Sequence, residues 1–166
     1  MFRGLVDDEP RTVGICRDVV DALDRGRNCL VLTQWTDHVQ RLCDHLRAFG
    51  RDPLVLTGGV GAKARAAVLD ALGATDRSGG LLLVATGSYL GEGFDCPTLD
   101  TLFLAFPLAF KGRIVQYVGR VLRTAPGKTV VEVHDYVDVN VPVLARMHTK
   151  RLRAFTTLGF DPPPRR

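Results

Sequence analysis

The chain has 166 residues, of which 46% are hydrophobic, and 22 basic against 18 acidic side chains give a net charge of +4. This size and composition predict one domain with its own core, and the small positive charge permits a nucleic-acid partner without requiring one. The absence of a leader-like segment and of any apolar run near 18 residues predicts a cytoplasmic protein with no membrane span. None of the four cysteines forms a Cys-x-x-Cys pair, so we expect no bound metal.

Apolar runs alternate along the chain with helical patterns. A helix from about residue 11 to Gly26 precedes the first apolar run, and Pro142 is preset for the first turn of the last helix. The predicted strands cover residues 29–33, 53–56, 81–85, 102–106 and 129–133. The other predicted helices cover residues 36–49, 62–72, 113–122 and 142–157. We expect a domain over residues 1–160, followed by a disordered tail or linker at 161–166.

Alternating strands and helices predict an α/β fold in three layers, with helices on both faces of a parallel sheet. Ligands of such sheets bind at the carboxyl ends of the strands. Small polar residues close or follow three of the predicted strands, namely Thr33, Thr57 with Gly58, and Thr86. We therefore expect a binding site at that edge of the sheet.

Two segments carry the strongest functional signal: Gly-Glu-Gly-Phe-Asp-Cys-Pro at 91–97 and Gln-Tyr-Val-Gly-Arg-Val-Leu-Arg at 116–123. The second segment is predicted to lie on one helical stretch, where spacings of three and four residues place Gln116, Arg120 and Arg123 on one face. The planar fork of a guanidinium matches the oxygens of a phosphate. Two arginines beside a glutamine therefore indicate a site for a polyphosphate.

Together and in this order, the two segments resemble motifs V and VI of superfamily 2 helicases and translocases, the DEAD/DEAH-type ATPases. The motif V pattern, a Thr and then Gly-x-Asp-x-Pro, is matched by Thr86, Gly93, Asp95 and Pro97. The motif VI pattern, Gln/His-x-x-Gly-Arg-x-x-Arg, is matched by Gln116, Gly119, Arg120 and Arg123. The resemblance runs from about residue 28 to 136, and more loosely from 11 to 158. It implies a C-terminal RecA-like domain.

The resemblance implies catalytic roles for three residues of motif VI. Arg120 and Arg123 would be arginine fingers that neutralise charge on the γ-phosphate as it transfers to water. Gln116 would couple that phosphate to the Asp-Glu motif across the cleft. The structural alternatives are surface salt bridges for the arginines and an exposed polar residue for Gln116.

Three further residues are implied on the nucleotide side. Asp95 would accept hydrogen bonds from the ribose hydroxyls, and Gly93 would allow a close approach of the backbone to the nucleotide. Gly119 would let its helix approach another backbone, since a glycine inside a helix otherwise costs about 1 kcal/mol. A loop cap is the structural alternative for Asp95.

Nucleic-acid contacts are implied at the strand ends. Thr86 resembles the motif V threonine that contacts the backbone, and hydroxyls at strand ends are ordinary phosphate ligands. Thr57, Gly58 and Arg65 resemble the family's glycine-containing turn and following arginine, with a plain turn and a solvated helix face as the alternative. Trp35 either stacks on a base or packs against the protein.

The phosphate loop of the first domain in these ATPases, Gly-x-x-x-x-Gly-Lys-Ser/Thr, does not occur in this sequence. Gly127-Lys128-Thr129 lacks the earlier glycine and leads from a helix into a strand, and Asp8-Glu9 follows no apolar strand. We therefore expect a phosphate-loop RecA-like domain as partner. ATP with Mg²⁺ would be the cofactor, and the metal would be held mainly by that domain. The protein would move along the backbone of DNA or RNA. Alone, the chain should not hydrolyse ATP.

Two other classes of function stay open. The chain could be a non-catalytic nucleic-acid or nucleotide-binding module with the same fold, or a nucleotide-binding regulatory protein that retains ATP. Residues 5–23 resemble the interdomain segment and opening helix of a second helicase domain, which favours the helicase interpretation.

Three further side-chain patterns do not by themselves indicate a function. Ser88, His134 and Asp135 contain the letters of a hydrolase triad, but no Gly-x-Ser-x-Gly elbow is present, and adjacent strand residues point to opposite faces. We expect His38 to pack in the core or at the surface. The basic stripe of the last helix either follows a nucleic-acid backbone or is a solvated face; it comprises Arg146, Lys150, Arg151 and Arg153.

Overall fold

The structure is a computed structural model, and it describes residues 2–74, 80–87, 94–107, 111–121, 123 and 125–161. The predicted tail at 162–166 lies outside the described residues. The helices are α1 (Phe2–Asp7), α2 (Glu9–Asp24), α3 (Thr36–Ala48), α4 (Ala62–Ala74), α5 (Lys111–Val121) and α6 (Pro142–Thr157). The strands are β1 (Cys29–Thr33), β2 (Leu54–Leu56), β3 (Leu82–Thr86), β4 (Thr101–Leu104) and β5 (Glu132–Asp135). No helix among the described residues is both long enough and apolar enough to cross a membrane.

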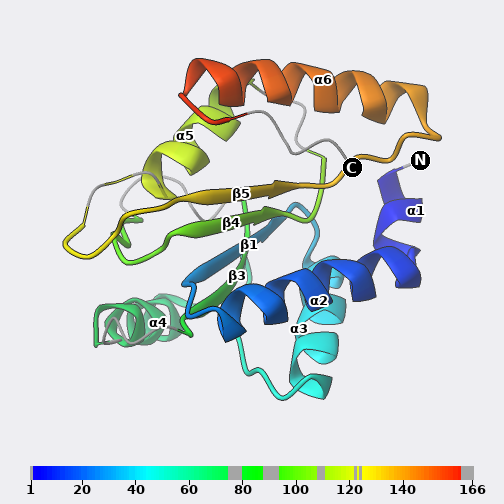
Figure 1. The fold of residues 1–166 in the computed structure, drawn as a ribbon. Coiled ribbons are helices and arrows are strands. Elements are labelled where there is room, and N and C mark those ends of the chain that lie inside the picture. The colour runs from blue at the N-terminus through cyan, green and yellow to red at the C-terminus, as the bar shows by residue number, and fades with distance from the viewer. Residues whose placement is uncertain are drawn as a thin grey trace.

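The five strands form one parallel sheet in the order β2-β3-β1-β4-β5. Figure 1 shows α5 and α6 on one side of the sheet and α2 and α3 on the other. The predicted α/β fold with a three-layer, RecA-like arrangement is therefore confirmed.

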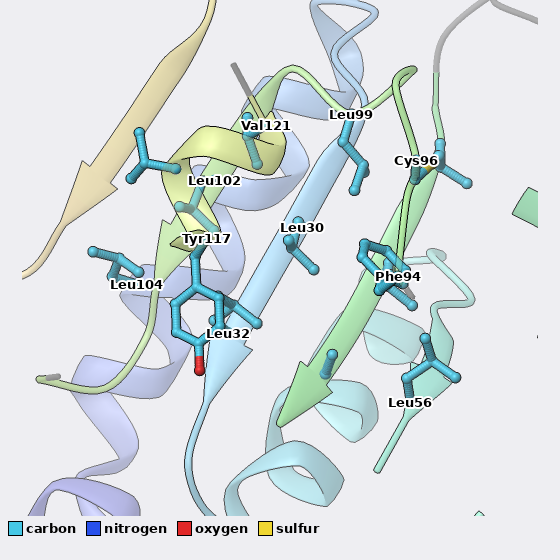
Figure 2. Packing of buried hydrophobic residues seen from close by; sticks show 14 of the residues in the cluster. Leu30, Leu32, Leu56, Phe94, Cys96, Leu99, Leu102, Leu104, Tyr117 and Val121 are labelled. Carbon is cyan, nitrogen blue, oxygen red and sulfur yellow. The ribbon is translucent and has the colours of Figure 1, made fainter. Parts of the chain in front are cut away.

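Successive residues of the central strands serve opposite faces of the sheet. In β1, Leu30 and Leu32 belong to the core beneath α5 and α6, whereas Cys29 and Val31 belong to the core beneath α2 and α3. Figure 2 shows the first of these cores, with Tyr117 of α5 packed over Leu32 and Leu102. Because both faces are covered, the central strands β1 and β3 are apolar runs that end in a threonine, without polar alternation.

The pair Asp8-Glu9 serves as the start of α2. The Asp8 carboxylate accepts a hydrogen bond from the backbone N–H of Arg11 at 3.0 Å, and Pro10 occupies the first turn, where its missing N–H costs nothing. This local role explains why an acidic pair occurs here, and it agrees with excluding the pair as a Mg²⁺-binding motif.

The last strand lies further along the chain than predicted. The apolar run at 129–131 suggested a strand over 129–133, but β5 begins at Glu132, which pairs with Thr101 of β4. Val130 lies before the strand and is 54% exposed, and its carbonyl accepts a hydrogen bond from Arg27 at 3.0 Å. Pairing with β4 sets the register, and no single-sequence pattern contains that pairing.

Candidate functional site

The two motif segments meet through an ion pair. The guanidinium of Arg123 donates a hydrogen bond from Nη1 to Oδ2 of Asp95. Both side chains are exposed, by 58% for Arg123 and 47% for Asp95. An exposed pair of this kind contributes about 0–1 kcal/mol, so either group can exchange it for another partner at small cost.

This pair lies away from the carboxyl ends of the strands. The chain leaves β3 at Thr86 and must return to the opposite end of the sheet to begin the parallel strand β4 at Thr101. Asp95 belongs to the later part of that return. In Figure 2, Cys96, Leu99 and Val121 lie toward the ends where the strands begin, while the hydroxyl of Tyr117 lies toward the arrowheads.

The structure corrects the expected helical face of motif VI. α5 contains Gln116, Gly119 and Arg120 but ends at Val121, so Arg123 lies two residues beyond it and the shared-face prediction is wrong for Arg123. Gln116 is exposed. Gly93 and the side chain of Arg120 lie outside the described residues.

The close backbone approach predicted at Gly119 is not present within the described part of the chain. The residue is exposed, and a Cβ added there would meet no described atom within 4 Å beyond its own helix. A role for Gly119 therefore requires a group from outside the described part of the chain.

The small polar residues expected at the carboxyl edge of the sheet lie there, and they include Thr57, Gly58 and Thr86, which were predicted to contact nucleic acid. Thr33 and Thr86 are partners in the β1–β3 register, and Thr57 directly follows Leu56, which pairs with Ala85. The three threonines thus end or directly follow neighbouring strands, and all are buried, with exposures of 1%, 4% and 7% for Thr33, Thr86 and Thr57. Gly58 is exposed beside Thr57, and Arg65 is half-buried in the first turn of α4.

Tyr117 links this edge to α5. Its hydroxyl donates a hydrogen bond to the carbonyl oxygen of Gly87, directly after Thr86, at 2.8 Å. A Cβ at Gly87 would lie only 2.5 Å from that hydroxyl oxygen, so a side chain there would displace the buried tyrosine. The sequence pattern did not lead to Tyr117, although its position next to Val118, on the apolar side of the motif VI helix, was a signal that it could be buried.

His38 lies in the core, which was one of the two positions expected for it, and it contacts the end of β1. Its Nδ1 lies 2.8 Å from the hydroxyl oxygen of Thr33, and the side chain is 0% exposed. Burial lowers the pKa of His38 to about 4, and the nearby cations of Arg11 and Arg41 add to this. The imidazole is therefore neutral near pH 7.

Trp35 is 43% exposed and contacts Phe106 edge-on at 6.5 Å, so its ring packs on the protein while keeping an open side.

The low pKa of His38 predicts a loss of stability in weak acid. Below pH ~6.5 the unfolded chain binds a proton at this histidine more readily than the folded chain does. The free energy of unfolding therefore decreases as the pH drops from about 6.5 toward about 4. Between pH 7 and pH 5 the loss should be about 2 kcal/mol. Urea unfolding at the two pH values would measure it. The same pH dependence in His38→Gln would contradict the assignment.

The remaining polar patterns are structural. His134 stacks on Phe103 at 4.3 Å, whereas Asp135 bonds His148 and Arg151 of α6, so these neighbours do face opposite sides of the sheet. Ser88 lies outside the described residues. Arg151 is 3% exposed, which removes it from the basic stripe of α6. Within the described ranges, no group of three His, Cys, Asp or Glu residues is arranged to hold a metal.

Comparison with known sequences finds viral relatives. Over 164 residues the chain is 24% identical to transcript termination protein A18 of fowlpox virus, covering 95% of this chain and 35% of that protein. It is 27% identical over 128 residues to A18 of Yaba-like disease virus, covering 75% of this chain and 26% of that protein. It is 32% identical over 80 residues to uncharacterized protein 108L of invertebrate iridescent virus 3, covering 48% of this chain and 72% of that protein. No protein-family model matches the chain.

Solved structures share the fold. T4 UvsW superposes with a TM-score of 0.73 at 18% identity, covering 94% of this chain and 34% of UvsW. The C-terminal part of the Fun30 ATPase domain gives a TM-score of 0.69 at 13% identity, covering 83% and 44% of the two chains. The ATP-dependent Type ISP restriction-modification enzyme LlaBIII, bound to DNA, gives 0.67 at 19% identity, covering 88% and 12%. The chain thus spans about a third of the length of both UvsW and the fowlpox protein.

Proposed function

The chain belongs to the family of protein 108L, and it has the RecA-like fold of the C-terminal domains of superfamily 2 helicases and ATPases. From this premise we propose that it is the second RecA-like domain of an ATP-dependent nucleic-acid helicase or translocase. The observation that carries the proposal is the contact between Asp95 and Arg123 on this fold. It brings the motif V and motif VI segments to one exposed place on the domain.

In this proposal the exposed pair faces a phosphate-loop domain that holds most of the ATP and its Mg²⁺. Arg123 and Arg120 direct their guanidinium groups to the γ-phosphate, and Gln116 contacts the same phosphate region. Asp95, released from Arg123, accepts hydrogen bonds from the ribose hydroxyls. Because the pair contributes at most about 1 kcal/mol, this exchange of partners costs little.

The nucleotide side also includes two glycines. Gly93 gives the motif V backbone access to the nucleotide, and Gly119 leaves room on α5 for the facing domain. The open space above Gly119 supports this role, because nothing described in this chain occupies it.

The nucleic-acid side of the proposal is the carboxyl edge of the sheet. Thr86, Thr57 and the backbone of Gly58 contact the sugar-phosphate backbone, and Arg65 adds a positive charge beside them. Contacts of these kinds fix the position of a strand without reading its sequence. This surface is separate from the Asp95–Arg123 pair, and α5 touches both, through Tyr117 at Gly87 and through the chain that leads to Arg123.

The alternative is a non-catalytic binding module with the same fold, and one activity experiment separates the two. The isolated chain should hydrolyse no ATP above background, with or without nucleic acid. Joined to a phosphate-loop RecA-like domain of the same superfamily, it should show turnover that a single strand stimulates. Turnover by the isolated chain that disappears in Arg123→Ala would refute the need for a second domain.

The joined protein needs two controls. Substitution of the phosphate-loop lysine in the added domain should abolish turnover, which shows that both halves contribute. Arg17→Met, which removes an exposed charge from α2, should leave turnover unchanged. A joined protein that is folded and binds single strands but never hydrolyses ATP would favour the binding module.

A further inference from the structure

Lys128 connects the two motif segments through hydrogen bonds to backbone carbonyl groups of both. Its ammonium donates hydrogen bonds to the carbonyl oxygens of Val121, Arg123 at 2.7 Å and Pro97 at 3.4 Å. Val121 is the last residue of α5, and Pro97 closes motif V. One cation therefore holds the end of the motif VI helix, the backbone of Arg123 and the end of motif V together.

A tight turn brings Lys128 back to this position. The backbone N–H of Lys128 bonds the carbonyl oxygen of Ala125 at 3.1 Å, and Gly127 between them has a φ of +81°. A proline followed by a glycine of positive φ is typical of a type II turn, which a residue with a side chain at the glycine position would strain. The turn reverses the chain after Arg123, so the lysine returns to the carbonyl groups that the helix end leaves without partners.

The local electrostatics suit a held cation. Carbonyl groups at the end of a helix carry partial negative charge, which favours a lysine there. Burial lowers the pKa of Lys128, and the carboxylate of Asp100 opposes that change. An ammonium partly removed from water depends on its carbonyl partners more than an exposed lysine would.

We propose that Lys128 is a positioning residue, which fixes the backbone of Arg123 against motif V and thereby sets where the Arg123 guanidinium lies. This inference rests on the proposed function, in which that guanidinium contacts the γ-phosphate. The lysine itself touches neither nucleotide nor nucleic acid. A plain helix cap would need only the contact with Val121, whereas Lys128 also holds Arg123 and Pro97.

The first test uses the isolated chain and needs no catalysis. With ¹⁵N-labelled arginine, the Nε–Hε signal of Arg123 is assigned by its loss in Arg123→Lys. In the wild type, Asp95→Asn should shift this signal, because it removes the charged partner. In a Lys128→Met background, Asp95→Asn should shift the Arg123 signal by less than about half as much as in the wild type. In a Lys128→Arg background most of the shift should return, and in an Arg17→Met background the shift should equal that of the wild type. A full shift in a folded Lys128→Met chain would overturn the proposal.

A measurement on the wild type covers the case in which Lys128→Met does not fold. Ammonium protons held by three carbonyl groups should exchange with water more slowly than those of the exposed Lys150 on α6. Exchange of the Lys128 protons as fast as those of Lys150 would contradict the held position.

The second test is kinetic and uses the chain joined to a phosphate-loop domain. Lys128→Met should lower kcat about ten- to a hundredfold while KM changes by less than about twofold, because a misplaced finger affects mainly the transition state. Arg27→Met serves as a control for lost stability, since Arg27 bonds the Thr101 hydroxyl and two backbone carbonyl groups. If Arg123→Lys leaves kcat intact, the proposed function fails; if it lowers kcat and Lys128→Met does not, only the role of Lys128 fails.

Discussion

Arg123→Lys is expected to lower kcat for ATP by at least about a hundredfold when the chain is joined to a phosphate-loop domain. Lysine keeps the charge but loses the planar fork, and an arginine finger stabilises charge that develops in the transition state. KM should change much less, because the contact strengthens only as the phosphoryl group transfers. Steady-state kinetics at saturating nucleic acid would measure both constants.

Two further variants make this result specific. Arg47→Lys makes the same change on the exposed face of α3, where Arg47 pairs with Asp52, and should leave kcat unchanged. Asp95→Ala should raise KM and leave kcat nearer normal, because a ribose contact is made equally in the ground and transition states. Intact turnover in Arg123→Lys, or a loss of kcat without a change of KM in Asp95→Ala, would show that the roles are assigned wrongly.

Asp135→Ala should cost about 3–5 kcal/mol of folding stability, because it removes one partner of a buried ion pair. Oδ2 of Asp135 lies 2.8 Å from Nε of Arg151 and 2.9 Å from Nδ1 of His148. The side chains of Asp135 and Arg151 are only 6% and 3% exposed. Without the carboxylate, a guanidinium remains buried between β5 and α6 with no opposite charge at this contact. Chemical denaturation at neutral pH would measure the loss.

The matched control is Asp52→Ala, which removes an exposed carboxylate paired with Arg47 at 3.2 Å. Its cost should stay within about 1 kcal/mol. The double change Asp135→Leu with Arg151→Met should be more stable than Asp135→Ala, because it removes the charge that the single change leaves buried. Equal costs for Asp135→Ala and Asp52→Ala would contradict the burial argument.

Local patterns determined most of the fold. The apolar run at 29–33 predicted β1 with its observed bounds, and Pro142 marked the start of α6. Strands buried on both faces are continuous apolar runs, and helices carry their own periodicity, so neither signal depends on distant residues. The two motif segments were equally visible, because each is defined by residues within a few positions of one another.

Only the tertiary structure decided how these residues meet. The pairing of Asp95 with Arg123, the burial of Arg151 against Asp135 and the contacts of Lys128 with Val121 and Pro97 all join separate elements. In the sequence, Lys128 belongs to Gly127-Lys128-Thr129, which only partly matches a phosphate loop. Arg151 was one of the four basic residues assigned to a surface stripe on the last helix. The place of Arg123 beyond α5 depends on contacts of the same kind, because the carbonyl groups of Val121 and Arg123 accept hydrogen bonds from Lys128, which a turn brings back to them. Contacts of this kind depend on chain reversal and strand register, which single-sequence periodicity does not contain.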